Sequence, residues 1–587
     1  MIKYSHFKSG ILFQPCGKSV ELGRAGERNG TMSAVTPRGF RDILPTEALA
    51  RERITGTVRE CFSRHGYLPV ETPLIEDRNL LSLGGKLQDS PFQLFDGDGS
   101  LLMVRPDLTL PIARMVSART SADDLPLRLR YAAPVVREES TLKGQPRQFT
   151  QLGVEYFGAD GIDGNLPETE VVSLLAETLD ALEAPAWRIV CGSVSPLKAL
   201  LDRRSPSSEF EERALGLAHE SDLVSLDELV DSTELDQSVR EALRRIPRLA
   251  GDASVIEEAD ALLDAAGIPA AERGTSELRA LVSSLADLAE EGRLTFDFSI
   301  ANSFDYYTGI IFKGYAEGIT ASIASGGRYD AVLANFGRPN VASCGFALSL
   351  ERLQEILGEQ GESGVVSSDV RLSERPLRIA VPKGSLFKDA VSVLESAGLP
   401  TDSLRDLGRK LIVRDGDYEY VIVRAQDAPT FVAHGGADCG ICGYDSIFEA
   451  NHDLIQLVDL RFGGCRFVVA EPRSKAGAAE DAYSWRGTVR VATKYPRITQ
   501  SYYDRIGQQV DIVQLHGNIE LGPIVGMTDR IVDITATGTT LAENDLVIVD
   551  EVMNCTARFF SGPAAYRYDT RIRDLAARLA QVVEANQ

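Results

Sequence analysis

A short stretch near the carboxyl end combines the residue types that hold a sugar phosphate. It reads Asp533-Ile-Thr-Ala-Thr-Gly-Thr-Thr-Leu541 and follows the apolar run Ile531-Val532, which predicts a buried strand. Gly538 allows the backbone to turn or to approach an anion closely, and the hydroxyls and N–H groups of such a turn bind phosphate. Asp533 would be repelled by phosphate, so we expect it to hold the two hydroxyls of a ribose. The stretch therefore favours a ribose 5-phosphate site, with an ordinary threonine-rich turn as the alternative.

The elements around this stretch are typical of an α/β unit. Short apolar runs predict strands at Leu377–Val381, Tyr420–Val423, Cys439–Ile441, Phe467–Ala470, Val489–Ala492, Ile512–Leu515 and Ile531–Ile534. Helical spacing recurs between them, at Phe387–Ala397 and Thr499–Ile506. This pattern indicates parallel sheets covered on both faces, divided into two lobes with a cleft between them. Ligands bind at the carboxyl ends of such strands, where Lys383 and Lys494 also lie.

Length and composition describe a globular chain of several units. At roughly 150 residues per domain, its 587 residues predict three or four. Hydrophobic residues make up 44% and charged residues 25%, and the net charge of -23 argues against non-specific nucleic-acid binding. We find neither a membrane-spanning run nor a secretory signal, and the scattered cysteines are typical of reduced, buried thiols. A cytoplasmic protein is expected, with Met32 as an alternative start to Met1.

One break divides the chain into two parts. Residues 1–32 are expected to form a disordered extension, 33–357 the first part, 358–375 a polar Gly/Ser-rich linker and 376–587 the second part. The first part has an α+β pattern, in which an antiparallel sheet is flanked by helices. An acidic, Ala/Leu-rich segment at about 197–292 predicts an inserted helical subdomain.

Several motifs of the first part occur in the order found in class II histidyl-tRNA synthetases, which this part resembles over about 320 residues. They are Pro37–Asp42, Arg105–Thr109, Arg137-Glu138, Gln151–Glu155, Asp305–Gly309, Gly326–Asp330 and Gly345–Arg352. The resemblance implies a histidine pocket formed by Asp107, Thr109, Arg137, Gln151, Glu155, Tyr306 and Tyr307. Carboxylate, amide and phenol oxygens satisfy an ammonium group and two ring nitrogens. Alternatively, Asp107 and Glu155 pair with Arg105 or Arg137 inside the sheet.

Two departures argue against a working synthetase. Asn302-Ser303 stands where the family carries Arg-Gly, which removes a cation from the site of adenylation. No anticodon-binding domain follows Arg352, so no tRNA partner is expected. The first part instead resembles the synthetase-derived regulatory subunit of ATP phosphoribosyltransferase, which implies a histidine sensor.

The second part resembles the short-form catalytic subunit of the same enzyme. The matching segments are Val381–Gly384, Gly408–Leu411, Arg424–Pro429, Gly435–Gly440, Ala492–Pro496, Gly517–Pro523 and Asp533–Leu541. The short form requires a synthetase-like partner, so each half predicts the other. The expected fold is a two-lobed α/β unit like that of periplasmic binding proteins.

The resemblance implies attack of the ATP adenine N1 on carbon 1 of phosphoribosyl pyrophosphate, with loss of pyrophosphate, the first step of histidine biosynthesis. Arg409, Lys410, Lys383 and Arg424 are the expected catalytic cations. Asp533, Thr535, Thr537, Gly538, Thr539, Thr540, Lys494 and Glu520 are the expected substrate-binding residues. Mg²⁺ is expected with the substrate phosphates, and no dedicated metal site. Ser385 stands where many relatives have an arginine, which leaves the rate open.

We therefore expect a pentosyltransferase inhibited by histidine, assembled as a tetramer of the fused chain. Two other functions remain open at this point. One is a non-catalytic receptor for small molecules, and the other is residual activation of histidine by the synthetase-like part.

Overall fold

The structure is a computed structural model that describes residues 36–85, 92–137, 146–158, 166–299, 307–358, 375–535 and 538–585, apart from the side chain of Ala482. The expected amino-terminal extension and nearly all of the expected linker lie outside these residues. Within them, no helix combines the length and apolarity needed to cross a membrane.

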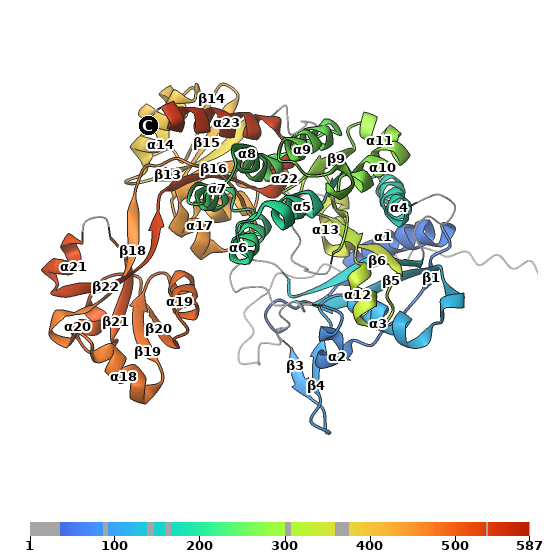
Figure 1. The fold of residues 1–587 in the computed structure, drawn as a ribbon, viewed down its shortest axis with the longest axis horizontal. Helices are drawn as coiled ribbons and strands as arrows, with labels where there is room; N and C mark the ends of the chain where they lie inside the picture. Colours follow the sequence, from blue (N-terminus) through green and yellow to red (C-terminus); the bar gives the residue numbers. More distant parts are fainter. Residues whose placement is uncertain are drawn as a thin grey trace, which may run out of the picture.

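A large sheet organises the first part (Figure 1). In the described residues it has nine strands, which lie in the order β1 (Leu68–Pro69), β5 (Leu127–Val136), β6 (Gln148–Gly158), β12 (Ala342–Ser349), β11 (Ala324–Arg328), β10 (Ile311–Tyr315), β7 (Arg188–Gly192), β9 (Leu294–Asp297) and β8 (Ala250–Gly251). From β5 to β7 every neighbouring pair is antiparallel. A small sheet of β2 (Ile75–Asp77), β4 (Leu101–Val104) and β3 (Gln93–Phe95) lies apart from it.

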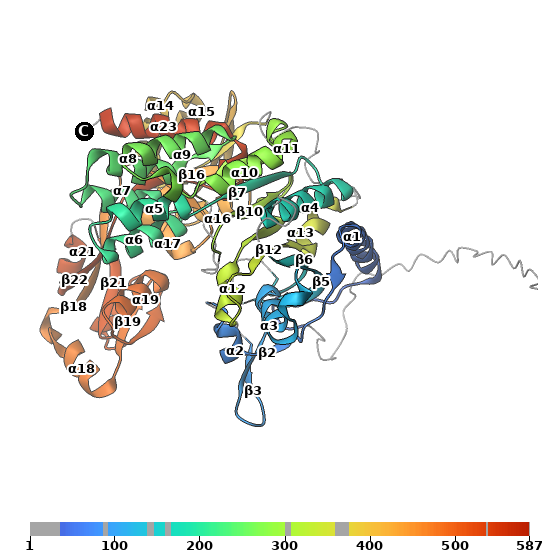
Figure 2. The ribbon, with the colours of Figure 1, turned by 45° about the vertical axis from the view of Figure 1, so that its right-hand side comes forward.

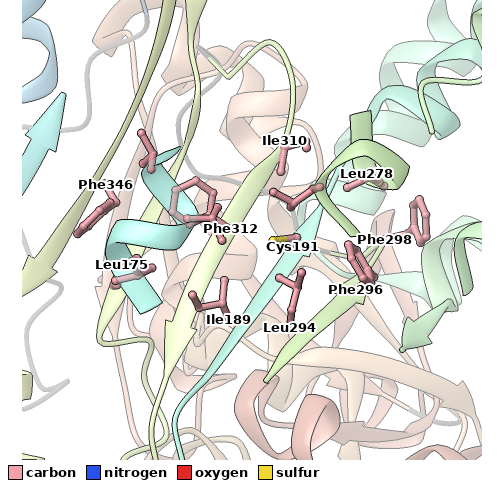
Figure 3. Packing of buried hydrophobic residues seen from close by; sticks show 14 of the residues in the cluster. Leu175, Ile189, Cys191, Leu278, Leu294, Phe296, Phe298, Ile310, Phe312 and Phe346 are labelled. Atoms are coloured by element: carbon pink, nitrogen blue, oxygen red, sulfur yellow. The ribbon is translucent and has the colours of Figure 1, made fainter. Parts of the chain in front are cut away.

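Helices cover this sheet because they bury their apolar faces against it. The long helices α1 (Pro45–Arg64) and α4 (Pro167–Ala181) each begin with proline, whose fixed φ suits a first helical turn. Figure 3 shows the core beneath, where Leu175 of α4 and Phe346 of β12 approach Ile189 and Phe312. The other helices of the sheet region are α2 (Arg78–Ser82), α3 (Thr109–Arg119), α12 (Asp330–Asn335) and α13 (Leu350–Leu357).

Between β7 and β9 the chain is mainly helical. The helices there are α5 (Ser195–Arg204), α6 (Ser208–His219), α7 (Leu223–Asp231), α8 (Gln237–Arg245), α9 (Ser254–Ala265), α10 (Ser276–Ser284) and α11 (Ala286–Glu290). Side-chain caps begin two of them: Ser207 accepts the N–H of Phe210 in α6, and Asp222 accepts the N–H of Ser225 in α7.

The second part divides into two lobes. The first lobe, residues 375–460 and 557–585, contains a sheet in the order β14 (Ile412–Asp415), β15 (Tyr418–Arg424), β13 (Leu377–Lys383), β16 (Cys439–Gly443), β23 (Ala557–Ser561) and β17 (Ile455–Asp459). Its helices are α14 (Phe387–Ser396), α15 (Asp402–Arg405), α16 (Ala428–Ala433), α17 (Tyr444–Ala450), α22 (Pro563–Tyr568) and α23 (Thr570–Ala585).

The second lobe, residues 465–555, is connected to the first lobe by two strands (Figure 1). Its sheet has the order β20 (Val510–Gln514), β19 (Val489–Thr493), β21 (Arg530–Thr535), β18 (Cys465–Pro472) and β22 (Leu546–Cys555). The helices are α18 (Ala478–Arg486), α19 (Pro496–Arg505), α20 (Leu521–Ile524) and α21 (Thr539–Glu543).

The prediction of parallel sheets is wrong in part. β13, β15 and β16 are parallel, and so are β19, β20 and β21, but β23 runs antiparallel to both of its neighbours and β18 runs antiparallel to β21 and β22. For β22 and β23 the cause is the path of the chain, which enters the second lobe through β18 and returns through these two strands. Strands on the return path must run against those that the chain leaves.

Ion pairs join the first lobe to the first part of the chain, whose helices lie beside it in both views (Figure 2). Arg558 of β23 pairs with Asp222 at 2.9 Å, and each side chain is 3% exposed. Arg567 of α22 pairs with Asp297 at 2.5 Å. Tyr566 donates its hydroxyl to the carbonyl of Arg248, 3.1 Å away. Leu223 of α7 is buried in the same apolar cluster as the strands of the first lobe.

Candidate functional site

Glu155, on the central strand β6, is the focus of a buried polar group in the first part. Its carboxylate accepts hydroxyl groups from Thr109 at 2.9 Å, from Tyr131 at 3.2 Å and from Tyr329 at a shorter distance. Burial raises the pKa of Glu155 to about 7, although the three hydroxyls oppose the rise. A carboxyl that titrates near neutrality changes its hydrogen bonding to a ligand within the physiological pH range.

Two glycines leave room for this group. A Cβ at Gly345 would lie 1.9 Å from Oε2 of Glu155, and one at Gly327 would lie 2.6 Å from the ring of Tyr307. Glu155 stands opposite Gly345 in the β6–β12 register. Tyr307 packs edge-on against Tyr329 with ring centroids 6.3 Å apart. Only glycine at these places lets the carboxylate and the phenol ring take their positions.

The other predicted pocket residues lie on the same sheet and on the loop beside it. Asp107, which is 4% exposed, accepts the N–H of Leu110 at 3.2 Å, and burial raises its pKa while the charge of Arg137 opposes the rise. Arg137 donates from Nε to the carbonyl of Pro106 at 2.8 Å. Gln151 is buried, and among the described residues its Oε1 has no hydrogen-bond partner. A buried acceptor without a donor is the kind of atom that a ligand N–H satisfies.

The geometry differs from the alternative in which Arg105 pairs with these carboxylates, whereas the charge of Arg137 does act on Asp107. Arg105 donates to the carbonyls of Thr72, Pro73 and Pro134. Glu155 is held by hydroxyls. Tyr306, a predicted pocket residue, lies outside the described residues, and so do Asn302 and Ser303.

In the first lobe, the predicted cations gather at one end of the sheet. Lys383 ends β13 and Arg424 ends β15, and the two residues are paired in the parallel register of these strands. Both are exposed. The N–H of Ile422 donates to the carbonyl of Leu411 at 2.8 Å, so Arg409 and Lys410 lie just beyond the start of β14, beside the same end of β15. The arrangement concentrates positive charge where anionic ligands of such sheets bind.

In the second lobe, Asp533 lies close to Lys494 and Glu520. Burial raises the pKa of Asp533, the charge of Lys494 opposes this rise and the charge of Glu520 adds to it. Asp533 is on β21, Lys494 follows β19, and these strands are parallel neighbours. The two carboxylates and the amine therefore come from the same end of the sheet.

The threonine loop turns at Gly538, which has φ 78°, a value that favours glycine. Its N–H donates to Oγ1 of Thr535 at 2.8 Å, and α21 begins at Thr539 and includes Thr540. Thr537 lies outside the described residues. Since Thr535 uses its hydroxyl oxygen to hold the turn, its role here is to shape the loop.

Two contacts between the lobes were absent from the sequence predictions. Glu449 of α17 accepts the N–H groups of Arg497 at 3.0 Å and Ile498 at 3.1 Å, in the first turn of α19. The side chain of Tyr495, just before α19, lies close to that of Gln426 in the first lobe. Tyr131 and Tyr329 were also missed in the pocket around Glu155. Tyr329 lies in the motif Gly326–Asp330, which carried a signal, whereas Tyr131 lies outside the motifs named above.

Chemically, the two regions differ. The pocket around Glu155 offers carboxylates, phenols and an unsatisfied amide oxygen to a small ligand rich in N–H groups. The two lobes offer cations on one side and carboxylates with a threonine loop on the other, which suits a phosphorylated sugar and a leaving anion.

Comparison with known proteins gives a family to each part. Residues 39–353 match the family described as "Histidyl-tRNA synthetase", and residues 424–581 match the family described as "ATP phosphoribosyltransferase". The chain is 47% identical over 208 residues to the ATP phosphoribosyltransferase of Rubrobacter xylanophilus, covering 35% of this chain and 96% of that protein. It is 35% identical over 325 residues to the ATP phosphoribosyltransferase regulatory subunit of Moorella thermoacetica, covering 55% of this chain and 82% of that protein.

A solved structure extends the likeness to the fold. The crystal structure of an ATP phosphoribosyltransferase regulatory subunit/histidyl-tRNA synthetase from Bacillus halodurans C superimposes with a TM-score of 0.51 at 26% identity, covering 67% of this chain and 100% of that chain. The class II synthetase-like fold predicted for the first part is thereby confirmed. The chain belongs to the ATP phosphoribosyltransferase family and joins, in one polypeptide, a part related to its synthetase-like regulatory subunits and a catalytic part.

Proposed function

We propose that the second part transfers the phosphoribosyl group of phosphoribosyl pyrophosphate to N1 of the ATP adenine, and that the first part binds histidine and thereby inhibits the transfer. The observation that carries the catalytic proposal is the in-register pair Lys383 and Arg424 at the carboxyl ends of adjacent parallel strands. Two cations at one edge of a sheet suit a reaction in which pyrophosphate leaves.

The catalytic work in this proposal is positioning and charge stabilisation. The pyrophosphate and the ATP phosphates are held by Lys383, Arg424, Arg409 and Lys410. The negative charge of the pyrophosphate increases as its bond to carbon 1 breaks. The protein brings together two polyanions that would otherwise repel each other. No side-chain nucleophile is needed, since the adenine nitrogen attacks carbon 1 directly.

The second lobe holds the sugar. Asp533 accepts hydrogen bonds from the ribose hydroxyls, Thr539, Thr540 and Gly538 bind the 5-phosphate with Thr537, and Lys494 balances the charge of Asp533. This assignment agrees with the burial of Asp533 and its closeness to Lys494 and Glu520.

Mg²⁺ is the metal that this chemistry implies. Mg²⁺ binds through one or two carboxylates together with substrate phosphates. The neighbouring carboxylates of Asp533 and Glu520 fit that need, because their negative charges repel each other and a bound cation relieves the repulsion. When bound, the ion neutralises phosphate charge. The described residues contain no group of three or more metal-binding side chains, so the phosphates would supply most of its ligands.

The decisive experiment is an initial-rate assay of pyrophosphate release by the purified full-length chain, with ATP and phosphoribosyl pyrophosphate, with and without histidine. We expect release that requires both substrates and falls with histidine. A chain that only binds small molecules would release none. Histidine-dependent exchange of pyrophosphate into ATP would instead reveal the residual synthetase reaction. The active species is proposed to be a tetramer of the fused chain, which sedimentation would measure in parallel.

Replacing Asp533 by asparagine should raise the KM for phosphoribosyl pyrophosphate about 10- to 150-fold, because a hydrogen bond to a charged acceptor is worth about 1.5–3 kcal/mol. The KM for ATP should change little. Asp511 on β20 provides the matched control, since its carboxylate lies in the same lobe and accepts the hydroxyl of Thr488 at 2.5 Å. Equal shifts in both KM values, or the same shift in Asp511→Asn, would contradict the assignment.

Histidine affinity should depend on pH through Glu155. The ionised carboxylate is the form that accepts a ring N–H, and burial raises the pKa of Glu155 to about 7. Between pH 7 and pH 6 the ionised fraction falls about fivefold, so affinity should fall by a similar factor beyond the effect of the ligand's own titration. Calorimetry on Glu155→Gln, which cannot ionise, isolates the ligand's contribution. Identical pH profiles for the two proteins would rule out this role.

A further inference from the structure

Two cysteines face each other where the chain passes between the lobes. Cys465 is the first residue of β18 and Cys555 is the last residue of β22, and they are direct partners in the antiparallel register. These are the two strands that connect the lobes (Figure 1). The pair therefore lies at the joint between the lobes, with one cysteine on each of the two strands that connect them.

The backbone geometry suits a disulfide. Directly opposed residues in antiparallel strands have Cα atoms about 4.5 or 5.5 Å apart, according to the kind of pair. Both values fall within the range of about 4.4–6.8 Å found in disulfides. The Sγ atom of Cys465 lies 3.8 Å from the carbonyl oxygen of Cys555. The register therefore places the two cysteines within the range of a disulfide.

The two thiols also differ in the way that a reactive pair requires. Cys465 is partly exposed, whereas Cys555 is 2% exposed. The side chain of Cys555 holds the pKa of Cys465 below its usual value through a hydrogen bond between the two side chains, against the effects of burial and of the Asp445 carboxylate. The same hydrogen bond, followed by burial, raises the pKa of Cys555. The more exposed thiol, that of Cys465, therefore lies beside a buried thiol that can resolve an adduct.

The other described cysteines lack these features. Cys61, Cys191, Cys344, Cys439 and Cys442 are buried. Burial raises the pKa of four of them, namely Cys191, Cys344, Cys439 and Cys442. Cys439 and Cys442 lie on one strand, three residues apart, so their side chains point to opposite faces.

We propose that Cys465 and Cys555 are a reversible oxidation site, whose disulfide fastens β18 to β22 at the joint between the lobes. The site goes beyond the proposed phosphoribosyl transfer and does not depend on it. Closure would enclose residues 466–554 in a covalent loop, so the second lobe could no longer separate its two connecting strands.

The oxidant is a small-molecule disulfide such as oxidised glutathione. The thiolate of Cys465 attacks one of its sulfurs, a mixed disulfide forms, and the other sulfur leaves as a thiolate. Cys555 then loses its proton and attacks the sulfur of Cys465, which expels the second thiolate. The protein loses two hydrogens, and the reagent is reduced to two thiols that take up the two protons.

The test is to incubate the native full-length chain with oxidised glutathione, remove the reagent and measure intact mass and free thiols. We expect a mass loss of about 2 Da, the loss of two thiols, a Cys465–Cys555 peptide in a non-reducing digest, and full reversal by dithiothreitol. Cys465→Ser and Cys555→Ser should each abolish the mass loss. Cys16→Ser, which alters a cysteine outside the described residues, should leave it intact.

Three results would overturn the proposal. The first is an unchanged thiol count in the native chain. The second is a lasting glutathione adduct on Cys465 without closure, and the third is a mass loss that persists in Cys465→Ser. Hydrogen exchange of the peptides that contain residues 460–466 and 554–558 tests the fastening itself, because oxidation should slow exchange there in the native chain and leave Cys465→Ser unchanged. Equal exchange rates before and after closure would remove the fastening role.

Discussion

Replacing Arg409 by alanine is expected to lower the rate of pyrophosphate release about a hundred- to a thousandfold, the effect of removing one group that stabilises charge in a transition state. Arg409 is exposed, follows the short helix α15 and lies beside the carboxyl end of β15 near Arg424. Its charge is therefore free to meet a leaving pyrophosphate. Because the contact strengthens as the bond to carbon 1 breaks, the loss should fall on kcat more than on KM.

Arg414→Ala is the matched control for this prediction. Arg414 lies on β14, only a few residues away, and its Nε donates to the carbonyl of Gly416 at 3.3 Å. It loses the same charge without touching the predicted site, so turnover should stay near that of the native chain. Histidine binding, measured by calorimetry, should be unchanged in both variants. Near-normal turnover in Arg409→Ala would remove Arg409 from the catalytic group.

Local patterns were enough to predict most elements of the second part. The helix predicted at Phe387–Ala397 is α14, Phe387–Ser396, and the predicted strand at Leu377–Val381 is the start of β13. Both have strong local signals: a helical apolar period in one, and a continuous apolar run in the other. Such signals reside within a few residues of each other, so a single sequence reveals them.

Sheet order and strand direction could not be predicted in the same way. β23 pairs with β16 and β17 across about a hundred residues of chain. Pairing depends on which strands meet once the lobes have formed. The apolar run of a buried strand is the same whether its neighbour runs parallel or antiparallel.

In the candidate sites too, residues within motifs could be predicted, and contacts that depend on the fold could not. The motif residues Thr109 and Glu155 were predicted to share a pocket, and they are hydrogen-bonded. Tyr131 and Tyr329, which complete the group, lie on or next to other strands, and no spacing in the sequence relates them to Glu155. Similarly, Glu449 meets α19 only because the two lobes pack together.

Replacing Arg567 by methionine should uncouple the two parts of the chain. Arg567 of the first lobe donates to Asp297 and to the hydroxyl of Tyr315, both at 2.5 Å, and its side chain is only 5% exposed. The substitution leaves Asp297 buried without its cation, which destabilises such sites by about 3–5 kcal/mol. A lower unfolding midpoint in urea is the first expected result.

The second expected result is weaker inhibition by histidine. Tyr315 ends β10 and belongs to an apolar cluster with Ile311 and with Ala564 of the first lobe, and Tyr307 of the proposed histidine pocket packs against that cluster. The pocket and the catalytic part thus share one packed group beside the ion pair. Loss of coupling worth about 1–3 kcal/mol would raise the inhibitory concentration of histidine about 5- to 150-fold.

A double variant separates the charge from the packing. In Arg567→Met/Asp297→Asn no buried charge is left unpaired, and the asparagine oxygen can still accept the N–H of Ser299, which Asp297 accepts at 2.7 Å. Stability should therefore recover in the double variant. Arg571→Met removes an arginine that pairs with Asp569 inside the first lobe, and histidine should inhibit it normally. If Arg567→Met were as stable and as sensitive to histidine as the native chain, the ion pair would have no part in joining the sensor to the catalytic lobes.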